Sequence, residues 1–393
     1  MLSAKANPRA SYAAAPEYLT KFANFSEAEG FYRSRVISAT RRRDDNARVA
    51  ELLNLGNVQR TRGTYPEALQ SYEQALALSR QRGDRDGEAG ALTDIGFVQS
   101  QQGYYPDALQ SGQQALALFR QLGDRDGEAG ALDNIGIVQR HQSQFPDALQ
   151  SHQRALALYR QLGDRNGQAG ALDNIGSVQS QQGRYPEALQ SHQQALALSR
   201  QLGDRDGEAI ELGNIGIAQS QQGQYPAALQ SQQQALALFR QLGDRAGEAR
   251  TLMNIGIVQR HQGEYRDALQ SDQQALALFR RLGDRDGEAS ALGNIGNVQA
   301  DQGQYPDALQ SQQQALALFQ QVGDRDGEAS ALENIGRVQS QQGQYPDALH
   351  SYGQALALYE QLRENAQAAR VSDAIARLKV PARPSPNATS TTP

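Results

Sequence analysis

Several residue types and patterns that signal common kinds of chemistry are missing from this chain. It contains no cysteine, which excludes a disulfide framework and thiolate chemistry with metals or redox partners. Its formal net charge is −5, whereas a nucleic-acid groove needs a basic stripe. No apolar run approaches the roughly 20 residues that cross a bilayer. These absences predict neither a nucleic-acid partner nor a membrane span.

Targeting and catalytic signatures are also missing. Residues 1–22, MLSAKANPRASYAAAPEYLTKF, have no uninterrupted apolar core, so we expect no signal peptide and a cytoplasmic location. No phosphate-binding loop, dinucleotide fingerprint or Ser–His–acid constellation is present. We therefore expect no catalytic residue and no cofactor, and the chain does not read as an enzyme.

What the chain does contain is one forty-residue segment, repeated without insertion or deletion. The copy at 127–166 reads GEAGALDNIGIVQRHQSQFPDALQSHQRALALYRQLGDRN. The glycine after its Asn-Ile pair has equivalents at Gly56, Gly96, Gly136, Gly176, Gly216, Gly256, Gly296 and Gly336. Eight copies at a fixed period predict a stacked array with one continuous core, not two or three separate globular domains.

Each repeat is predicted to form two helices. In the second copy the apolar positions of 92–99 and of 108–122 both follow a helical spacing. The first helix should stop near Gly103, the second should begin at Pro106 and end at Gly123, and Asp124 should cap the next helix. Gly96 and Ala108 are predicted to be the tight crossing point of the pair, where small residues let backbones approach.

The same register predicts how the chain is divided. Residues 1–46 are an N-terminal segment with an orphan capping helix at about 26–42, and residues 47–366 hold the eight repeats. Residues 367–380 are a C-terminal capping helix with a polar outer face, which an array needs where no further repeat follows. Residues 381–393, PARPSPNATSTTP, are predicted to be a disordered tail from their composition.

The pattern of Leu92, Ile95 and Gly96 with Gly103, Tyr105, Ala108 and Ala115 resembles the tetratricopeptide repeat. The period departs from the family's thirty-four residues, and Gln99 stands where the family usually has tyrosine. The second-helix aromatic is kept only at Tyr72 and Tyr352. Repeats of this longer type are similar to those of the Leu-Gly-Asn spindle-orientation scaffolds, of kinesin light chains and of many bacterial repeat proteins.

The resemblance implies an all-α fold: a right-handed α-solenoid, or superhelix, of antiparallel helix pairs with eight repeats and capping helices at both ends. It also implies that the first helices line a concave groove, which holds an extended peptide or a partner helix. It does not identify the partner.

An asparagine recurs one residue before the apolar residue that precedes the inner glycine. It occupies Asn54, Asn134, Asn174, Asn214, Asn254, Asn294 and Asn334, and Asp94 breaks the series. Because an amide offers both a donor and an acceptor, such a ladder can pair with the backbone of an extended peptide. The alternative is a polar residue that was simply copied by duplication.

The position after the inner glycine varies between copies. It is apolar at Phe97, Ile137, Ile217 and Ile257, and Met253 lies nearby. An exposed apolar strip with a polar rim marks a partner site, and core packing is the competing explanation. Asn57, Ser177, Asn297 and Arg337 at the same position favour the partner site.

The histidines give no metal signal by themselves. His152 and His192 are equivalent residues of adjacent repeats, too far apart to share an ion. The Asp-Arg-Asp-Gly-Glu loops, such as 124–128, lack the twelve-residue ligand spacing of calcium loops, and helix capping accounts for the same carboxylates. We expect no metal site.

Taken together, the sequence predicts a non-catalytic scaffold that binds a protein or peptide in the groove of a tetratricopeptide superhelix. Two alternatives remain open. One is a self-assembling structural array, which would make the chain a homo-oligomer. The other is a sensor or adaptor subunit of a larger signalling or defence system.

Overall fold

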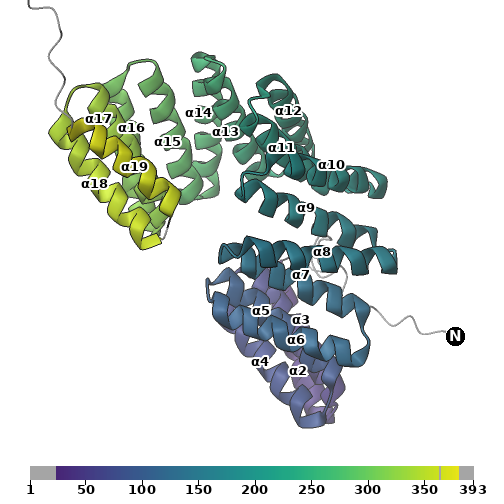
Figure 1. The fold of residues 1–393 in the computed structure, drawn as a ribbon. Helices are drawn as coiled ribbons and strands as arrows, with labels where there is room; N and C mark the ends of the chain where they lie inside the picture. Colours follow the sequence, from purple (N-terminus) through teal and green to yellow (C-terminus); the bar gives the residue numbers. More distant parts are fainter. Residues whose placement is uncertain (1–23, 363, 380–393) are drawn as a thin grey trace, which may run out of the picture. The chain divides into compact units, whose positions relative to one another are not determined.

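The computed structural model describes residues 24–362 and 364–379, and in these residues the chain forms helices and no strands (Figure 1). The predicted tail at 381–393 and most of the segment before the first helix lie outside the described residues. The chain divides into two compact parts, Met1–Ala218 and Gln219–Pro393, which we call the N-terminal and C-terminal parts. Each part is a stack of helix pairs, so the predicted all-α solenoid is confirmed.

The helices have nearly constant lengths. Those of the N-terminal part are α2 (Phe25–Arg42), α3 (Asp45–Arg62), α4 (Tyr65–Arg82), α5 (Arg85–Gln101), α6 (Tyr105–Leu122), α7 (Arg125–His141), α8 (Phe145–Leu162), α9 (Arg165–Gln181), α10 (Tyr185–Leu202) and the greater part of α11 (Arg205–Gln221). Those of the C-terminal part are α12 (Tyr225–Leu242), α13 (Arg245–His261), α14 (Tyr265–Leu282), α15 (Arg285–Asp301), α16 (Tyr305–Val322), α17 (Arg325–Gln341), α18 (Tyr345–Leu362) and α19 (Asn365–Lys379). Odd numbers from α3 to α17 are first helices of repeats, and even numbers from α4 to α18 are second helices.

The helix ends follow from local chemistry. The Asp124 carboxylate accepts a hydrogen bond from the Gly127 backbone N–H at 3.0 Å, and Gly123 ends α6 in the left-handed conformation with a φ of 67°. The predicted cap and stop are thus confirmed. Gly103, with a φ of 78°, lies in the turn after α5, and Pro106 stands in the first turn of α6.

An arginine–glutamate ion pair also ties the first helices α5, α7, α11, α13 and α15 to the second helix before each of them. Glu128 accepts from Arg120 of α6 at 2.8 Å and from Arg125 at 2.9 Å. Burial alone would raise the pKa of Glu128, but the two arginines outweigh it and hold that pKa below its ordinary value. The carboxylates of the acidic loops therefore accept hydrogen bonds from backbone N–H groups and from arginine side chains.

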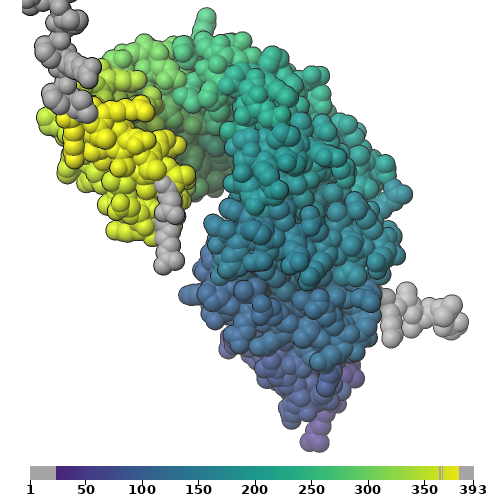
Figure 2. Space-filling model, in the orientation of Figure 1, coloured from purple at the N-terminus to yellow at the C-terminus, as the bar shows by residue number. Residues whose placement is uncertain are grey.

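The core consists of the constant apolar residues. Leu132, Ile135, Leu172 and Ile175 belong to one buried cluster of the N-terminal part, and the C-terminal part has an equivalent cluster around Leu252 and Leu292. In the space-filling view the purple and blue residues form one continuous surface (Figure 2). The stability of a repeat therefore depends on its neighbours.

The inner glycines are the crossing points, as predicted. A Cβ atom on Gly96 would lie 3.2 Å from the Ala108 carbonyl oxygen, tighter than ordinary packing. On Gly136 it would lie 2.6 Å from the His152 ring. Within the described residues, no helix is both long enough and apolar enough to cross a membrane.

Candidate functional site

The solenoid brings together residues that lie nineteen positions apart on three consecutive helices. One comes from a first helix, the next from the second helix beneath its inner glycine, and the last from the following first helix. We call each such trio a slot. The slots of the N-terminal part are Leu53–Tyr72–Ala91, Thr93–Gly112–Ala131, Asp133–His152–Ala171 and Asp173–His192–Glu211.

The middle residue of a slot is buried whatever its chemistry. Tyr72, His152 and Gln312 are all 0% exposed, and so is the carboxylate residue Asp272. Each lies against an inner glycine, which has no side chain to block it. The middle side chain can therefore reach first-helix residues: the Tyr72 hydroxyl donates to the Asn57 side-chain oxygen at 2.8 Å.

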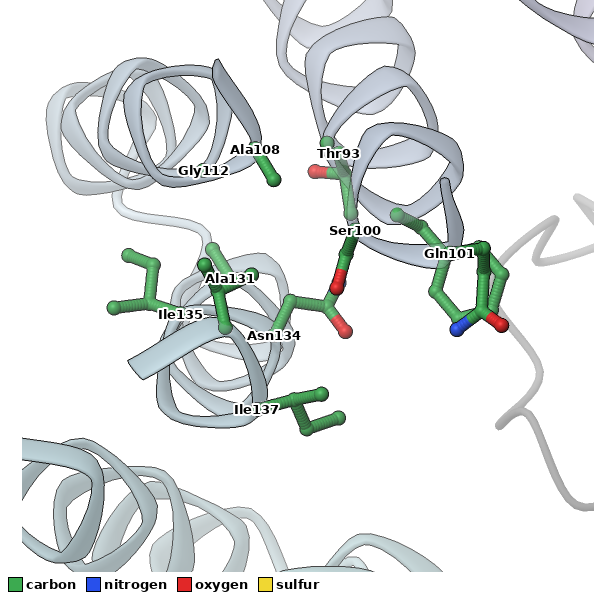
Figure 3. Close-up of a pocket in the computed structure, with 12 residues that line it drawn as sticks. Thr93, Ser100, Gln101, Ala108, Gly112, Ala131, Asn134, Ile135 and Ile137 are labelled. Carbon is green, nitrogen blue, oxygen red and sulfur yellow. The ribbon is translucent and has the colours of Figure 1, made fainter. Parts of the chain in front are cut away.

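The second slot is empty, because its three residues are small. Thr93, Gly112 and Ala131 line a pocket of about 60 Å³ between α5, α6 and α7 (Figure 3). Glycine at 112 lacks the ring that tyrosine or histidine supplies in neighbouring repeats, and Ile135 takes up part of that space, with its Cγ1 atom 3.0 Å from where a Cβ on residue 112 would lie. That volume is about four times the ~15 Å³ that one water molecule needs, so it can take a small aliphatic side chain.

Three predicted site residues meet at this pocket. Phe97, Asn134 and Ile137 all line it, and most of the other lining residues are apolar. Two polar atoms at the pocket, Asn134 Nδ2 and Ser100 Oγ, are buried and have no hydrogen-bond partner among the described residues. Buried polar groups without partners are rare in folded proteins. The pocket therefore combines an apolar cavity with two unused polar groups.

Two arginines belong to the surroundings of the pocket: Arg60 contacts the lining residue Phe97, and Arg140 belongs to α7, which supplies part of the lining. The Arg60 guanidinium stands over the Phe97 ring at 4.8 Å from its centroid, a cation–π arrangement. Arg140 is half-buried, and burial lowers its pKa, although the attraction of Asp173 opposes this. The surroundings of the pocket thus favour a ligand with polar or acidic groups beside its apolar side chain.

The asparagines differ in what they contact. Asn174 donates to Asp133 of the preceding repeat at 3.3 Å, and Asn214 donates to Asp173 at 3.0 Å. These two amides hold neighbouring first helices in register. They retain the side-chain oxygen and a second N–H for other partners.

In the C-terminal part, Asn294 and Asn334 line a polar pocket of about 250 Å³ at the slot Gly293–Gln312–Ala331. Met253 packs against the core cluster of that part. In the N-terminal part Ile217 is exposed, and Asn54 there is half-buried, as are Asn254 and Ile257 in the C-terminal part. Neither pocket is lined by Met253, Ile217, Asn54, Asn254 or Ile257.

Reasoning from sequence missed the middle residues of the slots. His152 contacts Asp133, with 2.5 Å between Nδ1 and Oδ1. His192 lies 2.9 Å from Glu211 and 3.3 Å from Asp173. Burial disfavours the charged form of His192, but the hydrogen bonds and charges of the two carboxylates outweigh it and raise its pKa to about 9.

A signal for these residues was present. The position varies as Tyr72, Gly112, His152, His192, Gln232, Asp272, Gln312 and Tyr352, on helices that are otherwise nearly constant. Variation in the first helices predicts positions that face a partner, whereas this variation in the second helices marks a buried position. Only the packing across three helices shows what the varied residues contact.

Comparison with known proteins places the repeat in a family. A model described as tetratricopeptide repeat matches residues 48–121, 89–161, 127–201, 167–241, 208–281 and 287–361. These overlapping segments cover most of the chain. No curated protein matches it.

Solved structures share the fold at low sequence identity. One is a signal transduction ATPase with numerous domains and a tetratricopeptide repeat sensor from Pyrococcus horikoshii, with a TM-score of 0.60, 14% identity and coverage of 93% of this chain and 57% of that one. A Rap conjugation gene regulator of a plasmid, in complex with a peptide, has a TM-score of 0.60, 12% identity and coverage of 88% and 97%. Aspartyl phosphate phosphatase F from Bacillus subtilis has a TM-score of 0.52, 14% identity and coverage of 84% and 94%. At these identities the likeness shows the fold alone.

Proposed function

Because the chain belongs to the tetratricopeptide repeat family, we propose that it is a protein-interaction scaffold that binds an extended peptide across its first helices. Catalysis is not part of this proposal. The observation that carries it is the empty slot Thr93–Gly112–Ala131, which three of the predicted site residues border.

The pocket sets the chemistry of the peptide. A small aliphatic side chain enters the cavity and covers Ile135 and Ile137, which line it. When the side chains of Asn134 and Ser100 turn toward the cavity, a backbone carbonyl beside the aliphatic side chain accepts hydrogen bonds from Asn134 Nδ2 and Ser100 Oγ, the two buried atoms that lack a partner among the described residues. Such contacts would remove the cost of leaving these two groups unpaired.

The comparisons support a peptide as the ligand. The Rap regulator, which resembles this chain in fold, was solved with a peptide bound. The match to a repeat sensor within a larger signalling ATPase supports the wider class of interaction proteins. Both resemblances concern the fold, so the choice of an extended peptide depends on the pocket.

The test begins with a displayed library of random peptides selected against the full chain. The affinity of a selected peptide is then measured on the unchanged protein and on two variants. Gly112→His fills the cavity with the residue that repeats three and four carry there, and Asn134→Ala removes the amide. We expect Gly112→His to weaken binding at least tenfold, which corresponds to about 1.4 kcal/mol, and Asn134→Ala to weaken it less.

Controls separate loss of binding from loss of structure. Circular dichroism should show equal helix content in all three proteins. Gln114→Ala, which changes an exposed residue of the second helix α6 that lines neither pocket, should leave affinity unchanged. If selected peptides bind Gly112→His as tightly as the unchanged protein, the pocket is not the binding site. Light scattering over a concentration range checks the self-assembly alternative, which predicts a mass that rises with concentration.

A further inference from the structure

We propose that the slot Asp173–His192–Glu211 is a binding site for a divalent transition-metal ion, with Zn²⁺ the best match. The three side chains come from α9, α10 and α11 and all lie in the N-terminal part. One ligand atom of each, His192 Nδ1 and one carboxylate oxygen each of Asp173 and Glu211, lies within 4.8 Å of the other two.

The distances suit a metal that replaces a proton. His192 Nδ1 lies 2.9 Å from Glu211 Oε2 and 3.3 Å from Asp173 Oδ1. Zinc binds nitrogen and carboxylate oxygen at roughly 2.0–2.2 Å, so in tetrahedral geometry its ligand atoms stand about 3.4 Å apart. The two distances to His192 are therefore within about 0.5 Å of this value, and small shifts of the side chains would admit an ion.

The charges favour a divalent cation. Two carboxylates face one imidazole, so the trio is negative when both carboxylates are ionised; burial raises the pKa of Glu211 to about 7, so there the ion competes with a proton. Among the described residues, His192 is the only basic side chain within ion-pair distance of either carboxylate; Arg140 attracts Asp173 from a distance without a hydrogen bond to it. A divalent ion balances both carboxylates and leaves the imidazole neutral, which is the form that ligates zinc.

The site also has a supporting contact and an entry path. Asn214 donates to Asp173 Oδ1 at 3.0 Å and fixes the orientation of that carboxylate, as residues behind metal ligands commonly do. The His192 side chain is 2% exposed and that of Glu211 5%, while that of Asp173 is 31% exposed. An ion can therefore enter past Asp173 and complete its coordination with water from that side.

Comparison between slots shows that this trio is distinctive. The preceding slot has Asp133 and His152 but Ala171 in the third position, so it offers only two ligands. The first two slots of the N-terminal part have none in the middle position, which holds tyrosine or glycine. Glutamate at 211 is what turns a two-ligand slot into a three-ligand slot.

This difference supplies a matched pair of variants. Glu211→Ala converts the site into the arrangement that the preceding repeat already folds with. Ala171→Glu adds the missing third ligand to the preceding slot, at a position where the next repeat buries a glutamate. Neither change introduces a residue that the fold does not already accept at the equivalent place.

The experiment is titration of the full, metal-free chain, made without a polyhistidine tag, with Zn²⁺ in a calorimeter. We expect one site in the unchanged protein and two in Ala171→Glu. Glu211→Ala should lose affinity by about 100-fold or more, and Asn214→Ala by roughly tenfold, within the range known for residues that only orient a ligand. The visible spectrum of added Co²⁺ should change from that of the aqueous ion in the unchanged protein and not in Glu211→Ala.

Two results would overturn the proposal. One is equal Zn²⁺ affinity in the unchanged protein and Glu211→Ala, with both folded by circular dichroism. The other is loss of binding when His141, His261 and His350 are replaced together by glutamine, which would place the ion on those histidines. Thermal melting gives an independent check, because an ion that binds only the folded chain raises its Tm. That rise should be absent in Glu211→Ala.

Discussion

At the scale of single residues, the middle position of the slot tolerates chemistry that a protein interior usually rejects. Asp272 is the extreme case, because it is 0% exposed and neither carboxylate oxygen has a hydrogen-bond partner in the described part of the chain. Burial raises its pKa to about 8, and the attraction of Arg260 opposes the shift only in part. At neutral pH this side chain is therefore largely protonated.

Asp272 makes the stability of the chain depend on pH. An unfolded aspartate has a pKa of about 3.9, so between that value and about 8 the folded state binds the extra proton. Below about pH 4 the side chain is protonated in both states, and its burial does not lower the free energy of unfolding through titration. As pH rises from there towards 8, the free energy of unfolding falls progressively. We expect Asp272→Asn to raise stability on the order of a few kcal/mol at pH 8 and to change it little at pH 4.5.

Urea unfolding at the two pH values measures this difference. Glu360→Gln, which removes an exposed carboxylate of the same part, is the control and should leave the pH profile unchanged. An Asp272→Asn effect of equal size at both pH values would show that titration of this group is not the cause.

At the scale of the helix, local sequence predicted the boundaries well, because the signals that end a helix lie within a few residues of its ends. Asp124, Gly123 and Pro106 act where they were expected to act. One exception is Ser143, which has a φ of 59° at a turn where the neighbouring repeats place Gly103 and Gly183. The packing of the array requires the left-handed conformation at this turn, and serine adopts it at a cost in conformational free energy, because it carries a Cβ atom.

Restoring glycine should remove that cost. We expect Ser143→Gly to stabilise the chain by about 1 kcal/mol, and Gly183→Ser to destabilise it by a similar amount at the equivalent turn. Thermal melting of both variants tests the pair. The two variants must shift the Tm in opposite directions. A lower Tm in both would mean that the Ser143 side chain makes a favourable contact.

The candidate site was less predictable than the helices. Phe97, Asn134 and Ile137 could be selected because first-helix variation stands out against constant packing residues. Gly112, which creates the cavity, and Glu211, which completes the acidic trio, could not. Their effect arises from residues nineteen and thirty-eight positions away, on helices whose adjacency only the packing reveals.

At the scale of the whole molecule, stability comes from contacts between neighbours. Within each part, consecutive helices pack along the chain and the same first-helix and second-helix faces meet at every step. The apolar residues of one repeat are too few to offset the conformational entropy of ordering it alone. A complete period is therefore the smallest change of length that preserves the contacts.

Deletion of residues 127–166 should accordingly leave a folded protein. It joins α6 to α9 in the register that α6 and α7 have now. Deletion of residues 127–146 removes half a period and puts a second helix where a first helix belongs. We expect the same helicity per residue and cooperative urea unfolding for the first deletion, and lost helicity or aggregation for the second. Equal behaviour of the two would contradict the array as the source of stability.

The slots also give the N-terminal part a direction. Its trios run in a fixed order from filled and aromatic, through empty, to acidic with two and then three ligand groups. A peptide bound across the first helices, as proposed above, would find a cavity at the Thr93–Gly112–Ala131 slot, because the middle residues of the other three slots fill theirs and are buried. That cavity would fix the position of the peptide along a chain that is otherwise almost perfectly periodic.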